Sequence, residues 1–284
     1  TQLANLTTGN LTALGTAQYA ALNSDQINAL TTGQVRSLET ADVRAITTAA
    51  LAGLTSTQVG ALTTDGVQAL TTAQVANLTS DQLKGMTTAD MVALTSSQVA
   101  ALNSIQAPSL NTDQLRAIEV ADIKALSTAD IKALDTAQIN ALTNGQLQAL
   151  SSAQIVALTT DQVQNLTTAN LNALTTDELA RFTTAQIRAL TTTQLANLTT
   201  GNLTALGTAQ YAALNSDQVN ALTTGQVRSL ETADVRAITT AALAGLTSTQ
   251  VGALTTDGVQ ALTTAQVANL TSDQLKGMTT ADRS

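Results

Sequence analysis

The reactive chemistry open to this chain is limited, because its 284 residues include no His and no Cys. Cys–His and Ser–His–Asp nucleophile systems, zinc sites with His or Cys ligands and dithiol redox motifs all require those residues. The densest pair of carboxylates is Asp177-Glu178, which could suggest acid–base or metal chemistry. The pair also fits the first turn of a helix, where acids interact favourably with the helix dipole. We therefore predict that the chain is not an enzyme and has no catalytic, cofactor-binding or metal-binding residues.

A second set of carboxylates recurs at one position of a repeat and could form a calcium ladder. Calcium-binding repeats supply several carboxylates and glycines in every unit, whereas this chain supplies one or two carboxylates at most. We therefore expect no dedicated calcium binding by the recurring aspartates, which are Asp25, Asp65, Asp81, Asp113 and Asp161.

The sequence that carries these residues is a tandem repeat of eight, without insertion or deletion from end to end. Each repeat, here called an octad and counted from Leu6, has a large apolar residue at its first position. A second apolar residue stands at the sixth position, from which only Ala107 and Arg283 depart. The consensus is Leu-Thr-Thr-Ala-Gln-Val-x-Ala, so we predict one continuous octad array over residues 1–284.

A longer repeat lies above the octads. Residues 1–90 recur as 193–282 with one change, Ile27 to Val219. The offset of 193 − 1 = 192 residues equals 24 octads, so a block of 24 octads was copied whole. Arg283-Ser284 interrupts the match and is interpreted as a cloning scar at the end of a piece excised from a larger protein.

Each octad carries the signals of one short helix. The second position is Thr, Ser, Asn or Asp almost throughout, which are the residues preferred as N-caps. Gln or Asp follows three residues later, as in Thr31 and Gln34, which is the spacing of a capping box. The first and sixth positions have the spacing of a hydrophobic staple around that cap. All 20 acidic residues lie at the second, fourth or fifth position and the basic ones almost entirely at the seventh, as a helix dipole favours.

These signals predict the architecture. Eight residues advance about 800° along a straight helix, so the apolar stripe would drift unless the helix breaks in every octad. We predict an all-α solenoid of very short capped helices, one per octad and each with roughly seven helical residues. Leu and Val are expected inside, and Thr, Gln and Asp outside. Two, three and four octads per turn of the solenoid are all compatible with the sequence.

The alternative fold is a β-solenoid. Thr and Val favour strands, and Thr pairs such as Thr31-Thr32, Thr63-Thr64 and Thr71-Thr72 would stack into flat rows of hydroxyl groups. Abundant Ala and Gln and the polarity of the charges favour the helical fold.

Pro108 is the one local exception to the pattern, at a seventh position beside Ala107. It removes a backbone donor, so we expect it to weaken or kink the helix of its octad.

Charge and hydropathy restrict the partners. The net charge is −8, and the 12 Lys and Arg residues are scattered singly, which argues against nucleic acid as a partner. The sequence contains no run of about 18 apolar residues and no signal peptide, so we expect no membrane insertion.

Two functions fit such an array. An extended structural segment that sets the distance between functional ends would need only a uniform, polar outer surface. The alternative is a binding solenoid that holds a peptide, a glycan or another copy of itself in a filament. Its binding surface would be a basic ribbon of seventh-position residues, namely Arg36, Arg44, Lys84, Arg116, Lys124 and Lys132.

The run from Leu70 to Leu78, Leu-Thr-Thr-Ala-Gln-Val-Ala-Asn-Leu, and its counterparts along the whole chain resemble the short Leu-Thr-x-x-Gln-Val repeats of very large bacterial proteins of adhesin type. The resemblance implies a bacterial source, an extracellular or cell-surface location and a stalk or spacer role. It supplies no catalytic, cofactor or ligand residues.

Overall fold

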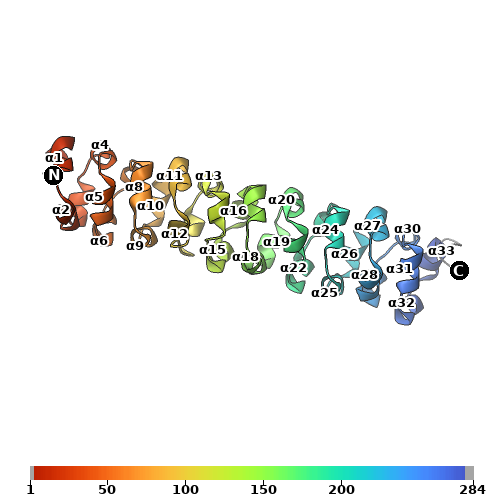
Figure 1. Ribbon diagram of the computed structural model, residues 1–284. Helices are drawn as coiled ribbons and strands as arrows, with labels where there is room; N and C mark the ends of the chain where they lie inside the picture. Colours follow the sequence, from red (N-terminus) through yellow and green to blue (C-terminus); the bar gives the residue numbers. More distant parts are fainter. Residues whose placement is uncertain (1–2, 279–284) are drawn as a thin grey trace. The chain divides into compact units, whose positions relative to one another are not determined.

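The computed structural model describes residues 3–278, which form a succession of short α-helices (Figure 1). Each α-helix contains four to six residues. The chain divides into two compact units, Thr1–Ala157 (unit 1) and Leu158–Ser284 (unit 2). None of the described residues lies in a β-strand, so the β-solenoid alternative is wrong.

Unit 1 contains two 3-10 helices and the first eighteen α-helices, which are η1 Leu3–Asn5, α1 Thr8–Thr12, α2 Thr16–Ala20, α3 Ser24–Asn28, α4 Thr32–Arg36, α5 Thr40–Ala45, α6 Thr48–Leu51, α7 Ser56–Val59, α8 Thr64–Ala69, α9 Thr72–Ala76, α10 Ser80–Gly85, α11 Thr88–Ala93, α12 Ser96–Val99, η2 Ala107–Ser109, α13 Thr112–Ala117, α14 Val120–Ile123, α15 Thr128–Ala133, α16 Thr136–Ala141, α17 Asn144–Gln148 and α18 Ser152–Ala157. Unit 2 contains the remaining α-helices, which are α19 Thr160–Gln164, α20 Thr168–Ala173, α21 Thr176–Leu179, α22 Thr184–Ala189, α23 Thr192–Ala196, α24 Thr200–Thr204, α25 Thr208–Tyr211, α26 Ser216–Asn220, α27 Thr224–Arg228, α28 Thr232–Ala237, α29 Thr240–Leu243, α30 Ser248–Val251, α31 Thr256–Ala261, α32 Thr264–Ala268 and α33 Ser272–Gly277.

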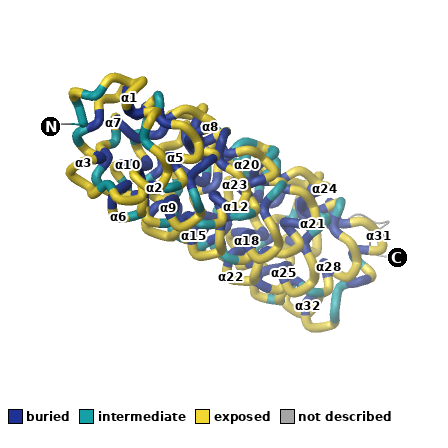
Figure 2. The backbone as a smooth tube through the Cα atoms, turned by 60° about the vertical axis from the view of Figure 1, so that its left-hand side comes forward, coloured by how far each residue is buried: buried dark blue, intermediate teal, exposed yellow. Residues whose placement is uncertain are grey.

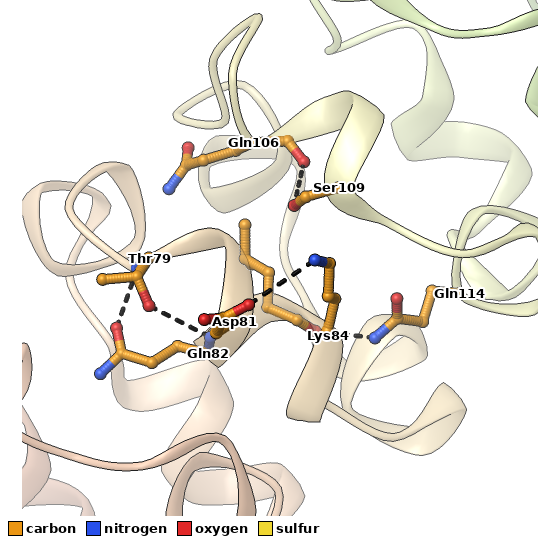
Figure 3. Close-up of polar contacts among 8 residues, drawn as sticks. Thr79, Asp81, Gln82, Lys84, Gln106, Ser109 and Gln114 are labelled. Atoms are coloured by element: carbon orange, nitrogen blue, oxygen red, sulfur yellow. Dashed lines mark hydrogen bonds and ion pairs between the residues drawn. The ribbon is translucent and has the colours of Figure 1, made fainter.

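The helices begin as the capping pattern predicts. At α10 the side chain of Thr79 accepts a hydrogen bond from the Gln82 backbone N–H at 3.2 Å, and the Gln82 side chain accepts one from the Thr79 N–H at 2.9 Å (Figure 3). Gly15 has no side chain, so only the Gln18 half of the box forms at α2, at 2.7 Å. The predicted N-caps therefore set the helix starts in most octads.

The helices are shorter than the predicted seven residues. The N-cap at Thr47 is extended, with φ −66° and ψ 154°, and so is the preceding residue Ile46, with φ −60° and ψ 128°. A capping residue must leave the helical conformation, and the first-position residue turns with it so that its side chain enters the core. Two or more residues of each octad are thus lost to the helix.

Packing repeats every three octads. Helices in contact include α7 with α10, α5 with α8 and, in unit 2, α30 with α33. First- and sixth-position side chains fill the interior of each unit, as at Leu78, which is 5% exposed, and Val75, which is fully buried. Figure 2 shows buried segments recurring along the tube with exposed segments between them. The expectation that Leu and Val lie inside is confirmed.

Pro108 removes the α-helix of its own octad, which forms the 3-10 helix η2 instead. The octad nevertheless keeps its packing partners, because η2 contacts both α10 and α15. Gln106 also keeps hydrogen bonds from its amide to the carbonyls of Val75 and Leu78, at 2.8 Å each. The effect of the proline is therefore confined to local helix geometry.

None of the helices formed by residues 3–278 has the length and apolar composition required to cross a membrane.

Two glycines show where the backbones of packed helices touch. A Cβ added at Gly85 in α10 would collide with the carbonyl of Ser56 in α7, and one at Gly60 with the carbonyl of Gly85. At Gly33 in α4 the nearest atom to an added Cβ is the Thr31 hydroxyl, 3.9 Å away.

Gly85→Ala should therefore lower the free energy of unfolding by about 1–3 kcal/mol, because α7 and α10 must move apart. Gly33→Ala should raise it by up to about 1 kcal/mol, because alanine favours a helix over glycine. Urea unfolding followed by circular dichroism measures both. Equal effects of the two substitutions would contradict the close approach of α7 and α10.

Candidate functional site

Fifth-position glutamines form the most regular polar feature of the structure. Most of them act twice: the Oε1 accepts from the N-cap backbone N–H, and the Nε2 donates to one, two or three backbone carbonyls 28 to 31 residues earlier. Gln74 donates to the carbonyls of Val43 at 2.8 Å and Ile46 at 2.7 Å, at the end of α5. We call this set the glutamine ladder; its members are Gln34, Gln58, Gln74, Gln82, Gln98, Gln106, Gln114, Gln138, Gln146 and Gln154 in unit 1, and Gln186, Gln194, Gln210, Gln218, Gln226, Gln250, Gln266 and Gln274 in unit 2.

The ladder meets a need that short helices create. The last carbonyls of a helix have no partner within it, and these helices end inside a packed core. The ladder amides supply donors to those carbonyls, and Figure 3 shows one member, Gln114, reaching toward the end of α10. The expectation that glutamine lies outside is wrong: Gln74 and Gln82 are each only 2% exposed.

Seventh-position side chains complete the same task. Asn28 donates to the carbonyl of Gly53 at 2.6 Å, and Arg44 Nε donates to the carbonyl of Ala69 at 3.5 Å, in both cases 25 residues ahead. Arg188 and Arg236 repeat the arginine contact in unit 2, at 3.4 Å. Part of the predicted basic ribbon is therefore engaged with backbone carbonyls of neighbouring helices.

The remaining basic residues form few ion pairs. Lys84 pairs with Asp81 at 3.6 Å on the surface of α10 (Figure 3). Exposed pairs of this kind contribute little to stability. Arg44 lines a shallow surface hollow together with Thr40, Asp65, Gln68 and Ala69.

The structure separates the carboxylates that could have formed a site. Asp177 is exposed, whereas Glu178 is buried and accepts a hydrogen bond from the Thr175 N–H at 2.6 Å as the capping partner of α21. Burial raises the pKa of Glu178. The fourth-position aspartates, among them Asp25 and Asp65, lie on the surface. Among residues 3–278 no three Asp or Glu side chains gather into a group able to hold a metal ion.

Aspartate replaces glutamine at several rungs of the ladder, and at two of these rungs a tyrosine supplies a donor instead. Asp42 and Asp234 are each 4% exposed and lack an amide to donate. The register assigns the Leu11 carbonyl to Asp42 and the Leu203 carbonyl to Asp234. The hydroxyl of Tyr19 donates to the Leu11 carbonyl at 2.9 Å, and that of Tyr211 to the Leu203 carbonyl at 2.7 Å. Each tyrosine thus supplies the missing donor.

Burial and neighbouring carboxylates raise the pKa values of both the tyrosines and the aspartates. Burial raises the pKa of Tyr19 to about 12, and the charges of Asp42 and Glu39 add to the rise. Burial likewise raises the pKa of Asp234 to about 6, with a further contribution from the charge of Glu231. The pKa values of Tyr211 and Asp42 move in the same directions for the same reasons.

Asp234 should make stability depend on pH. Its pKa in the folded chain is higher than the ordinary value of 3.8, so its contribution to stability is fully present below about pH 4 and is lost as the pH rises through about 6. Asp234→Asn should remove that loss and raise the free energy of unfolding at pH 7 by about 1–3 kcal/mol. Denaturant unfolding at pH 4.5 and pH 7 gives the free energy of unfolding of both chains. If that free energy changes between the two pH values by the same amount in the variant as in the unmodified chain, the assignment to Asp234 is contradicted.

One feature of the sequence signals the ladder and is not explained by capping. Glutamate serves the capping box as well as glutamine does, yet glutamine dominates the fifth position and Glu178 is the one glutamate there. A preference for the amide indicates that the Nε2 donor has a partner of its own.

Comparison with known proteins gives a family but no characterised relative. No curated protein matches the chain significantly. The family model of the ALTTAQ repeat matches residues 3–38, 35–72, 115–151, 141–168, 168–203, 197–230 and 227–264. Because these stretches cover well over half of the sequence, the protein belongs to the ALTTAQ repeat family.

Proposed function

We propose that this chain is a non-catalytic solenoid that acts as a stalk or spacer in a large bacterial cell-surface or secreted protein. Within each unit the helices pack on the helix three octads away, and the ladder amides reach back 28 to 31 residues. These spacings correspond to between three and four octads per turn of the solenoid. The resemblance to adhesin-type repeats supports the location.

The observation that carries the proposal is the uniformity of the ladder. The same two-sided glutamine contact recurs in unit 1 and unit 2, as at Gln82 and Gln226, and the octad register passes between the units without a break. A structure whose every turn makes the same contacts gains length by adding octads and loses it by removing them.

Deleting whole octads tests this function. Because the chain has no Cys, Thr40→Cys and Thr128→Cys would place two spin labels at exposed third positions of unit 1. Removing residues 62–85, three octads, should shorten the distance between the labels by about 10 Å, the spacing of packed helices. Pulsed electron resonance measures the change.

The control removes residues 62–65, half an octad, which shifts the register and should unfold the region between the labels. An unchanged distance after the three-octad deletion would contradict the spacer. Retention of an ordered structure after the half-octad deletion would contradict the register on which the spacer depends.

A further inference from the structure

Asp130 occupies a rung of the ladder without any of the substitutes found elsewhere. It lies in α15 and is 1% exposed. Its Oδ2 accepts from the Ser127 N–H at 2.8 Å, as a capping partner should. Its Oδ1 is buried and has no hydrogen-bond partner among the described residues.

The register of the neighbouring rungs indicates what Oδ1 faces. Gln114, Gln138 and Gln146 place their amide nitrogen 2.6 to 2.8 Å from the carbonyl 28 residues earlier. The equivalent carbonyl for Asp130 belongs to Leu102, and the one 31 residues earlier belongs to Val99. The packing of α15 on η2, whose octad begins at Leu102, agrees with this register.

Two other replaced rungs have a side-chain hydroxyl that donates a hydrogen bond there. Tyr211 donates to the carbonyl that Asp234 leaves unserved. Asp122, one octad before Asp130, accepts a hydrogen bond from the hydroxyl of Ser96. Neither the Asp130 Oδ1 nor the Leu102 carbonyl has such a donor within residues 3–278.

We propose that the Asp130 carboxylate and the carbonyls of Val99 and Leu102 bind one alkali-metal cation, Na⁺ or K⁺, where other rungs hold the ladder nitrogen. A buried charge is costly unless it is paired, and the ion pairs Lys84 with Asp81 and Lys276 with Asp273 do not involve Asp130. The carboxylate balances one positive charge, and the two carbonyls add neutral oxygen ligands. A divalent ion such as Ca²⁺ would leave a positive charge uncompensated in the buried site.

The site lies beside a segment through which a cation can enter. The neighbouring octad forms only the three-residue 3-10 helix η2 instead of an α-helix. Such a segment opens locally more easily than regular helix. A cation can therefore reach the interior without unfolding of the whole unit.

The test compares thermal unfolding of the full chain at pH 7 in NaCl, KCl and choline chloride of equal ionic strength. The unmodified chain should melt about 2–5 °C higher in NaCl or KCl than in choline chloride, because the cation binds only the folded state. Asp130→Gln should abolish the difference, since its amide supplies the donor directly. Asp122→Gln is the matched control and should retain it.

Sodium-23 line widths in the same samples report binding directly. The sodium line should be narrower with Asp130→Gln than with the unmodified chain or with Asp122→Gln. Equal melting of the unmodified chain in all three salts would overturn the proposal. So would an Asp130→Gln chain that keeps the cation effect, which would indicate a general response of the acidic surface. Stabilisation by acid alone, without cation dependence, would assign a proton to the site instead.

Discussion

Gln74→Glu is expected to destabilise unit 1 by about 3–5 kcal/mol, although it changes one buried NH₂ group to an oxygen. The Gln74 amide donates to the carbonyls of Val43 and Ile46 and is 2% exposed. Glutamate retains an acceptor for the Thr71 N–H, which lies 2.7 Å from the Gln74 Oε1 in the unmodified chain. It then places a carboxylate against two carbonyl oxygens, with no donor between them.

Gln26→Glu is the matched control. Gln26 accepts from the Asn23 N–H at 2.9 Å in the same capping role, but its side chain is exposed. This substitution should change the free energy of unfolding by less than about 0.5 kcal/mol. Urea unfolding measures both variants. Similar losses in the two would show that the glutamines act only as caps.

Val75→Asp is expected to lower the free energy of unfolding by a similar amount, but for a different physical reason. Val75 is fully buried at the sixth position of its octad. A carboxylate there has no partner and costs about 3–5 kcal/mol or protonates. In an array stabilised by contacts between neighbours, the loss should spread to adjacent turns and broaden the unfolding transition.

Ala73→Asp separates burial from charge in the same helix. Ala73 is exposed and occupies the fourth position, where Asp65 and Asp81 stand in neighbouring octads. An acid there lies near the start of α9 and should be neutral or slightly stabilising. Thermal unfolding of the two variants should differ by many degrees, and equal melting temperatures would contradict a buried sixth-position stripe.

Local features of the fold could be predicted because their causes lie within one octad. The N-cap at Thr79 and its partner Gln82 are three residues apart, and a capping box is recognisable at that distance. The apolar series at the first and sixth positions identified the core side chains for the same reason. The helices are shorter than expected because the extended residues at the cap, such as Ile46 and Thr47, also take up part of each octad.

The second role of glutamine could not be predicted because its partner is remote. Gln74 meets Val43 and Ile46, 31 and 28 residues earlier, because the chain returns alongside itself between three and four octads further on. The sequence is compatible with two, three or four. The role of Tyr19 could not be predicted for the same reason. Its hydroxyl donates to the Leu11 carbonyl, which receives no hydrogen bond from Asp42, 31 residues later.

The sequence predicts where the acidic residues lie along their helices but not which of them are buried. Glu178 was expected in the first turn of a helix and is found there in α21. Its burial follows from its fifth position, which faces the core, whereas Asp177 at the fourth position faces solvent. Helix-dipole reasoning places a charge along a helix but does not say which side of the helix it occupies.

Far-ultraviolet circular dichroism together with small-angle X-ray scattering on the same sample tests the spacer solenoid most directly. We predict a helical spectrum and rod-like scattering, with a maximum dimension that grows in proportion to the number of octads. A β spectrum, or a helical but compact particle whose size does not increase with added octads, would contradict it.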